Sequence, residues 1–276
     1  MSRAPSPTPA LSLPPILAIA AIVLLTPLTV ALAQPAAATG RTPDSAPDTA
    51  QEVVDRAIAF HGGDLYEGSE TTLTITSRSG SFRVVSRMEG DRFDHQVISD
   101  TRKGAEQRVR TTNDRVEVWL DGVAQEVSPE EEQGWRDMVS ARVYFPFLPY
   151  RLNDPSVHKQ DLGFEEWDGR RLRKIKVTFE VGTSTDASDE YLYWFDPDTG
   201  RLEQFAYSFH TGNGGVRLRK GFNYRRVGGI LFMDSENWGR DGRKLTVDDI
   251  TPETVAKKLK KISTVELSDI EVEPVS

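Results

Sequence analysis

The sequence predicts an α+β protein, mainly β, in which one curved antiparallel sheet packs two or three helices against its concave side. The main observation is a strict alternation in which Ile175, Val177 and Phe179 are separated by lysine and threonine. A period of two is typical of a strand with one buried and one solvated face. Similar segments recur at hairpin spacing from residue 71 to residue 272, and we count about ten or eleven strands.

Turn signals between these segments are the second observation. Asp-Gly pairs stand at 121–122 and 168–169, and both residue types tolerate the positive φ angles of a tight hairpin. The Asp-Pro-Asp-Thr-Gly run at 196–200 partly resembles a calcium-binding loop, but it lacks the later ligands. A hairpin turn explains every residue of that run.

Helix-start signals interrupt the strands at three places. The spacing of apolar residues predicts a helix over 48–60, which ends at a His-Gly-Gly element at 61–63. Ser128, followed by proline and three glutamates, begins a second helix. Thr251, also followed by proline, begins a third, which we expect to reach Lys261. The Pro- and aromatic-rich run at 144–150 can be either a plug of the core or a hydrophobic flap over a ligand site.

The amino-terminal segment predicts export. Residues 1–33 contain one charge, Arg3, and end in Ala31-Leu32-Ala33, which fits the small-x-small rule of signal peptidases. An uncleaved membrane anchor is the alternative. We expect a signal peptide at 1–33, a disordered linker at 34–48 and a single domain at 49–276. Because of the signal peptide, we expect the domain in the periplasm.

Composition excludes several classes of function. The 276 residues include no cysteine, which excludes disulfides and thiolate metal sites, and the net charge of −8 gives no general attraction for nucleic acid. The four histidines lack metal-ligand spacing, and P-loop, GxSxG and helix-opening GxGxxG motifs are absent. We therefore expect no metal, no cofactor and no enzymatic activity.

Three motifs together resemble the LolA-like superfamily, whose members include outer-membrane lipoprotein-sorting carriers. They are the His-Gly-Gly element, Trp-Asp-Gly before Lys-Ile-Lys-Val-Thr-Phe, and Tyr-Leu-Tyr-Trp-Phe-Asp-Pro-Asp-Thr-Gly. The sequence is most similar to an uncharacterised branch that carries His61, Gly62 and Gly63. The resemblance covers about 51–272. It implies an open half-barrel of about eleven strands, lidded by helices, whose hollow binds acyl chains.

An acyl carrier needs an apolar wall that its own side chains do not fill. We expect wall residues on the inner faces of the strands and lid residues in the central helical region, although plain core packing would produce the same pattern. The wall candidates are Phe82, Val84, Met88, Phe93, Val118, Ile175, Val177, Phe179, Tyr191 and Tyr193, and the lid candidates are Trp135, Met138, Phe145 and Phe147.

Three hypotheses of function follow. The first is a periplasmic, monomeric carrier or sensor of lipid or lipoprotein acyl chains, with lipid or an acylated protein as partner and transient contacts to other envelope proteins. The second is a protein-interaction domain on the same fold. The third is a hydrolase that uses His61 with an acid such as Asp64, although a histidine at a helix end more commonly packs there and bonds a carbonyl.

Overall fold

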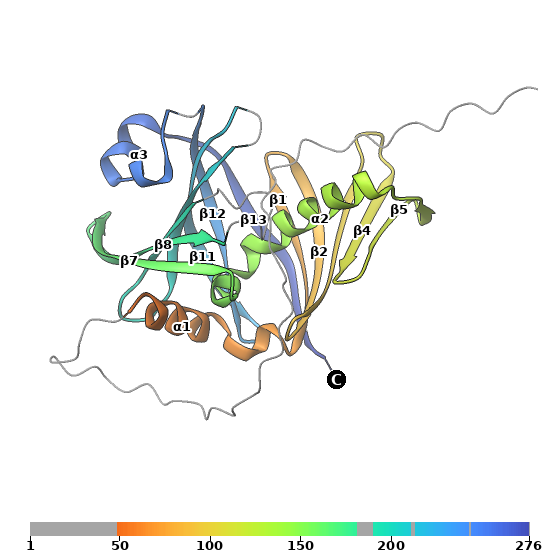
Figure 1. Ribbon diagram of the computed structural model, residues 1–276, viewed down its shortest axis with the longest axis horizontal. Coiled ribbons are helices and arrows are strands. Elements are labelled where there is room, and N and C mark those ends of the chain that lie inside the picture. The colour runs from red at the N-terminus through yellow and green to blue at the C-terminus, as the bar shows by residue number, and fades with distance from the viewer. Residues whose placement is uncertain (1–48, 181–189, 211–212, 243, 276) are drawn as a thin grey trace, which may run out of the picture.

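The computed structural model describes residues 49–180, 190–210, 213–242 and 244–275 (Figure 1). The expected signal peptide, the expected linker and most of the polar loop before Glu190 lie outside these residues. Thirteen antiparallel strands form one sheet in the order β6-β5-β4-β3-β2-β1-β13-β12-β11-β10-β9-β8-β7. The predicted fold class is confirmed: the sheet is curved and open, and helices cover it.

The sheet consists of two sequential meanders that the last strand joins. The first meander comprises β1 Ser69–Ser77, β2 Gly80–Glu89, β3 Arg92–Asp100, β4 Glu106–Thr112, β5 Val116–Leu120 and β6 Val123–Gln125. The second comprises β7 Val157–Trp167, β8 Arg170–Phe179, β9 Tyr191–Phe195, β10 Leu202–Phe209, β11 Gly215–Val227 and β12 Ile230–Asp241. Strand β13, Lys260–Pro274, pairs with β1 on one side and β12 on the other. The carboxyl-terminal strand therefore holds the two halves of the sheet together.

The strand count exceeds the expected ten or eleven because two weak segments also pair. The polar β4 pairs with both β3 and β5, and the three-residue β6 forms the edge beside β5. Asp121 and Asp168 have φ angles of 47° and 50°, and each is followed by a glycine that also has positive φ. Both Asp-Gly pairs thus turn the chain as predicted.

The three predicted helix starts are confirmed. Helix α1 (Ala50–His61) begins after Thr49, and α2 (Pro129–Tyr144) begins after Ser128; each cap forms a reciprocal capping box with a glutamate. Helix α3 (Pro252–Lys258) follows Thr251 and ends three residues before the expected Lys261. It ends there because Leu259 is extended and buried, and the chain then pairs with β12. None of the helices in the described part of the chain is long and apolar enough to cross a bilayer.

Helices α1 and α2 cover one face of the sheet, which we call the inner face, whereas α3 lies on the outer face (Figure 1). Strand β9 shows the division, because Tyr191, Tyr193 and Phe195 pack inward and Leu192 and Trp194 pack outward against the α3 region. This strand is buried on both faces, which the sequence signalled by five consecutive apolar residues. Only two of the three helices therefore pack where the sequence analysis placed them.

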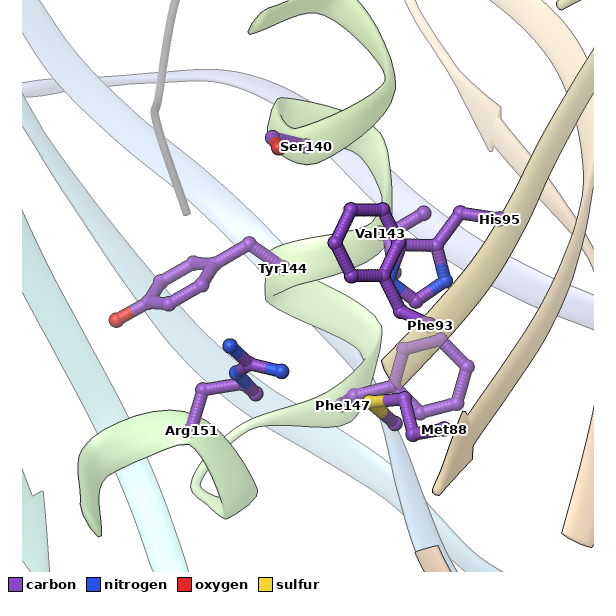
Figure 2. A pocket seen from close by; sticks show the side chains of 8 residues that line it. All are labelled: Met88, Phe93, His95, Ser140, Val143, Tyr144, Phe147 and Arg151. Atoms are coloured by element: carbon purple, nitrogen blue, oxygen red, sulfur yellow. The ribbon is translucent and has the colours of Figure 1, made fainter. Parts of the chain in front are cut away.

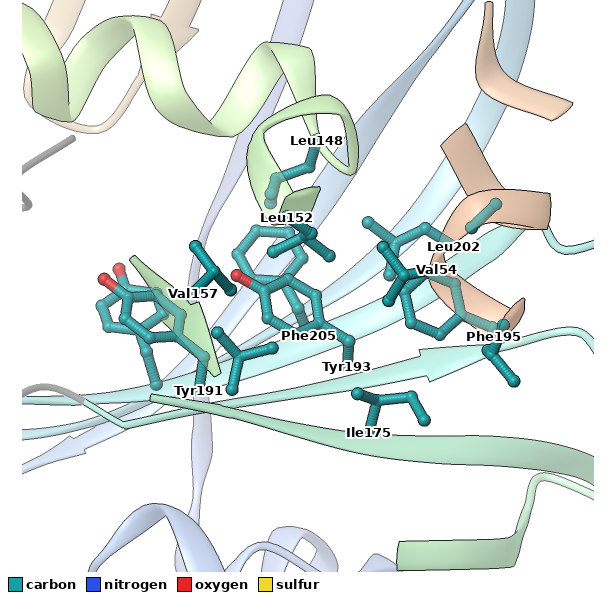
Figure 3. Close-up of a cluster of buried hydrophobic side chains, with 14 of the residues drawn as sticks. Val54, Leu148, Leu152, Val157, Ile175, Tyr191, Tyr193, Phe195, Leu202 and Phe205 are labelled. Atoms are coloured by element: carbon teal, nitrogen blue, oxygen red, sulfur yellow. The ribbon is translucent and has the colours of Figure 1, made fainter. Parts of the chain in front are cut away.

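The inner face carries two separate hydrophobic cores. The first, which we call the N-terminal core, lies between α2 and the first meander: Tyr66, Leu73, Ile75, Val84, Met88, Val97, Val109, Val118, Trp135, Met138, Val139, Val143, Phe147, Ile230, Phe232 and Leu267. The second, the C-terminal core, lies between α1, the segment after α2 and the second meander (Figure 3): Val53, Val54, Ala57, Tyr144, Leu148, Leu152, Val157, Ile175, Val177, Tyr191, Tyr193, Phe195, Leu202, Phe205, Tyr207 and Phe209.

Candidate functional site

The segment over residues 129–153, which we call the lid segment, connects the two inner cores. It contains α2 and two short 3-10 helices, η2 (Phe145–Phe147) and η3 (Tyr150–Asn153). Val143 and Phe147 pack into the N-terminal core, whereas their chain neighbours Tyr144 and Leu148 pack into the C-terminal core. A displacement of this segment would therefore open both cores at once.

All fourteen predicted wall and lid residues lie on the inner face. Eight of them belong to the N-terminal core or pack against it: Phe82, Val84, Met88, Phe93, Val118, Trp135, Met138 and Phe147. The other six belong to the C-terminal core or pack against it: Phe145, Ile175, Val177, Phe179, Tyr191 and Tyr193. The alternation pattern thus identified the correct face, but it does not separate residues that fill the interior from residues that border a hollow.

A small cavity lies between the lid segment and strands β2 and β3 (Figure 2). Its volume is about 30 Å³, and it is lined by Met88, Phe93, His95, Ser140, Val143, Tyr144, Phe147 and Arg151. A water molecule needs about 10–15 Å³ by the same measure, so the cavity has room for about two waters and not for an acyl chain. The lid segment is therefore closed over the inner face in this structure.

The cavity is mainly apolar, with polar groups supplied by three residues that the sequence analysis did not select. His95 Nδ1 lies 3.0 Å from Ser86 Oγ, and its ring stacks on Phe93 with centroids 4.8 Å apart. Burial lowers the pKa of His95 to about 3, so the imidazole is neutral at pH 7. Phe93, His95 and Val97 alternate with polar residues along β3, and this alternation puts the histidine on the buried face.

Arg151 supplies the one formal charge among the eight lining side chains. It extends from η3 towards Tyr144, and its Nε donates a hydrogen bond of 2.8 Å to the carboxylate of Asp154 (Figure 2). Burial raises the pKa of Asp154, and the neighbouring Arg151 opposes that rise. Tyr144 connects the lid segment to strand β9 through a 2.8 Å hydrogen bond between its hydroxyl and that of Tyr193.

Comparison with known proteins identifies the family. The family described as a family of unknown function, DUF6503, matches residues 49–267, which is well over half of the chain. The chain belongs to the DUF6503 family. No curated protein matches it.

Solved structures show the fold that this DUF6503 chain shares. A LolA superfamily protein from Nitrosomonas europaea has 13% sequence identity and a TM-score of 0.50, over 83% of this chain and 96% of that one. An outer membrane lipoprotein-sorting protein domain from Vibrio parahaemolyticus has 13% identity, a TM-score of 0.45, and coverage of 82% and 92%. A DUF1329 family protein from Desulfovibrio piger has 12% identity, a TM-score of 0.45, and coverage of 82% and 94%. The likeness to the Nitrosomonas europaea protein confirms, at the level of the fold, the resemblance to the LolA-like superfamily.

The His-Gly-Gly element of the DUF6503 chain connects α1 to the sheet. His61 is 1% exposed, and its Nε2 accepts a hydrogen bond of 3.0 Å from the backbone N–H of Leu202 at the start of β10. We expected this histidine to bond a carbonyl; its Nε2 accepts from an amide, and the backbone of Leu231 also acts on the ring and favours its protonated form. Burial lowers the pKa of His61 to about 4. With Nε2 engaged and the ring buried, the geometry does not favour His61 as the base of a hydrolase.

The two glycines of the element differ in surroundings, which gives a matched pair of substitutions. A Cβ at Gly62 (φ 154°) would lie 3.1 Å from Ile230 and 3.2 Å from Tyr66, whereas a Cβ at Gly63 (φ 55°) would meet open space. We expect Gly63→Ala to cost about 1–2 kcal/mol for its left-handed backbone, and Gly62→Ala to cost more because packing strain is added. Urea unfolding of both variants measures the difference, and equal losses would contradict this explanation.

The Asp-Pro-Asp-Thr-Gly run of this DUF6503 chain forms the predicted hairpin turn. Asp196 Oδ1 accepts hydrogen bonds from the backbone N–H groups of Asp198 and Thr199, and Arg170 pairs with the same carboxylate at 3.1 Å. In the described part of the chain, no group of three or more His, Cys, Asp or Glu residues is suited to hold a metal ion.

Proposed function

We propose that this protein is an exported, non-enzymatic carrier of the acyl chains of lipids or lipoproteins. The ligand site is the interior beneath the lid segment, where the two inner cores meet. The observation that carries the proposal is the division of the inner face into two apolar cores that share one helical cover. A single helical cover over two apolar walls suits a binding protein better than a purely structural domain.

The energetics of ligand entry are compatible with a closed resting state. Displacing the lid segment exposes apolar surface, and an acyl chain that enters covers that surface again. Each methylene transferred from water stabilises the complex by about 0.8 kcal/mol. A chain of several methylenes therefore offsets the cost of opening, and the protein protects its own interior when no ligand is bound.

The predicted leader and the LolA superfamily fold support the proposed location in the periplasm. Such a location matches the need for a carrier, because acyl chains cannot cross an aqueous compartment unprotected. Transient contacts with a donor or acceptor in the envelope belong to the same proposal.

A chain-length series tests the proposal. The full chain is expressed with its leader, purified from the periplasm, and titrated with a fluorescent fatty acid that is displaced by saturated acids of eight to sixteen carbons. We expect native mass spectrometry to show co-purified lipid. We also expect affinity to rise by up to about fourfold per added methylene. A lipid-free mass together with no uptake of any chain length would overturn the carrier function.

A further inference from the structure

The cavity between the lid segment and the first meander has a polar side as well as an apolar one. Met88, Phe93, Val143 and Phe147 form the apolar lining. The polar groups are Arg151 and Ser140 from the lid segment and His95 from β3. Burying an unpaired guanidinium lowers the stability of a protein. A site that bound only hydrocarbon would gain nothing from the arginine that lines this cavity.

The sign of the charge at this cavity is opposite to that of the whole chain. The protein has 42 acidic against 34 basic residues, yet none of the eight lining side chains is acidic. Asp154 stands behind Arg151 and holds one edge of its guanidinium, with 2.8 Å from the carboxylate to both Nε and a terminal nitrogen. A guanidinium has five N–H donors in a planar fork, which suits a second carboxylate or a phosphate.

Neighbouring groups add hydrogen-bond donors without adding negative charge. Arg151, His95 and Tyr144 line the same cavity, so these three side chains surround one space. Nδ1 of His95 lies 3.0 Å from Ser86 Oγ, and the ring itself lines the cavity. Ser140 contributes a hydroxyl from α2.

The size of the cavity matches a head group rather than a tail. A volume of about 30 Å³ has room for about two water-sized groups, which is the number of oxygens that a carboxylate carries. A carboxylate is therefore close in size to the cavity as it stands, whereas a larger phosphate head or a hydrocarbon tail requires movement of the lid segment.

We propose that the ligand is a single-chain amphiphile with an anionic head, and that Arg151, His95 and Ser140 bind this head while the tail enters between the lid segment and the sheet. This proposal rests on the carrier function and narrows its ligand class. It favours a lipid with a free acidic group over a lipid that carries none. Asp154 positions Arg151 and also competes with the ligand for it.

The test compares three ligands that share a sixteen-carbon chain: palmitate, lysophosphatidate and uncharged hexadecanol. We expect each anionic ligand to bind the wild-type full chain about tenfold or more tightly than hexadecanol, since hydrogen bonds to charged groups are worth more than neutral ones. The relative affinities of palmitate and lysophosphatidate show whether the natural head is a carboxylate or a phosphate. Equal binding of all three ligands would overturn the proposed head-group site and leave the carrier function intact, whereas no binding of any would overturn both.

Two variants separate recognition from structure. Asp154→Asn should tighten palmitate binding and leave hexadecanol binding unchanged, because it removes a competing negative charge; a purely structural role for the ion pair predicts weaker binding of both. The double variant Arg151→Met with Asp154→Asn removes the pair without leaving a buried charge unpaired. In this variant we expect palmitate affinity to fall to that of hexadecanol, and a retained preference for palmitate would contradict the assignment of Arg151.

Discussion

Replacing Phe147 with alanine is expected to destabilise the protein by about 3–5 kcal/mol and to increase its uptake of an acyl ligand. Phe147 is 2% exposed, and its ring lies 6.4 Å from those of both Tyr66 and Phe232. Its truncation removes these contacts and enlarges the cavity that it lines. Urea unfolding measures the loss of stability, and titration with a fluorescent fatty acid measures the gain in binding.

A matched variant distinguishes a cavity effect from general loosening. Phe195 is completely buried in the C-terminal core and does not line the cavity; Figure 3 shows it next to Val54 of α1. Phe195→Ala should cost a similar free energy of unfolding without increasing uptake. If the two variants took up the probe equally, the increase would come from destabilisation alone, and the cavity beneath the lid segment would lose its assigned role.

The architecture was predictable because local signals and tertiary packing agree in this chain. Strand β1 has a buried residue at nearly every second position, and β2, β3 and β4 show the same alternation over part of their length. The capping residues Thr49, Ser128 and Thr251 each begin a helix. Strand β9 is buried on both faces, so it shows no alternation, but its five apolar residues between turn signals predict a strand equally well. A fold can be predicted from one sequence when local propensity, hydrophobic pattern and tertiary packing all favour the same structure.

Two features depended on contacts that a single sequence does not reveal. The length of β13 and the early end of α3 follow from pairing with β12 and β1, which lie at opposite ends of the domain sequence. Helix α3 lies on the outer face because the sheet has a second apolar face there. On this face Trp167, Leu192 and Trp194 belong to the same hydrophobic cluster as residues of the α3 region. Long-range pairing of this kind overrides local propensity.

The candidate site was predicted only in its apolar part. Among the wall and lid candidates, Met88, Phe93 and Phe147 line the cavity, whereas Arg151 and Ser140 gave no local signal because arginine and serine usually face solvent. Arg151 is turned inward by the short helix η3, and Asp154 then fixes its guanidinium. His95 was the exception, since its place between Phe93 and Val97 predicts burial even though its type does not.

Acidification from pH 7 to pH 5 is expected to lower the free energy of unfolding by about 4 kcal/mol through two histidines alone. The pKa values of His61 and His95 fall from 6.5 to about 4 and about 3 in the folded protein, mainly because both rings are buried. A lowered folded-state pKa means that the unfolded chain binds the proton first. The stability from each neutral ring is thus present above pH 6.5 and is lost as the pH falls towards the folded-state value. Each histidine contributes about 2 kcal/mol over this window.

Variants that keep the hydrogen bonds but not the titration identify the source of the acid sensitivity. Gln at position 61 places an acceptor near the Nε2 of His61, and Asn at position 95 places one near the Nδ1 of His95, so His61→Gln and His95→Asn should each reduce the pH slope by about 1.4 kcal/mol per pH unit. His158→Gln, at an exposed position of β7, is the control for the replacement of a histidine as such.

Four carboxyl groups with shifted pKa values do not add to the loss of stability between pH 7 and pH 5. The pKa of Asp196, Glu236 and Asp249 is lowered from values that already lie below pH 5, so these groups become important only at lower pH. Asp154, whose pKa is raised by burial, takes up its proton more readily in the folded state and therefore opposes the loss. Urea unfolding at pH 7, 6 and 5 measures the slopes. An unchanged slope in both histidine variants would show that neither ring is held neutral in the folded protein, and would remove the premise that His95 faces the cavity as an uncharged hydrogen-bonding group.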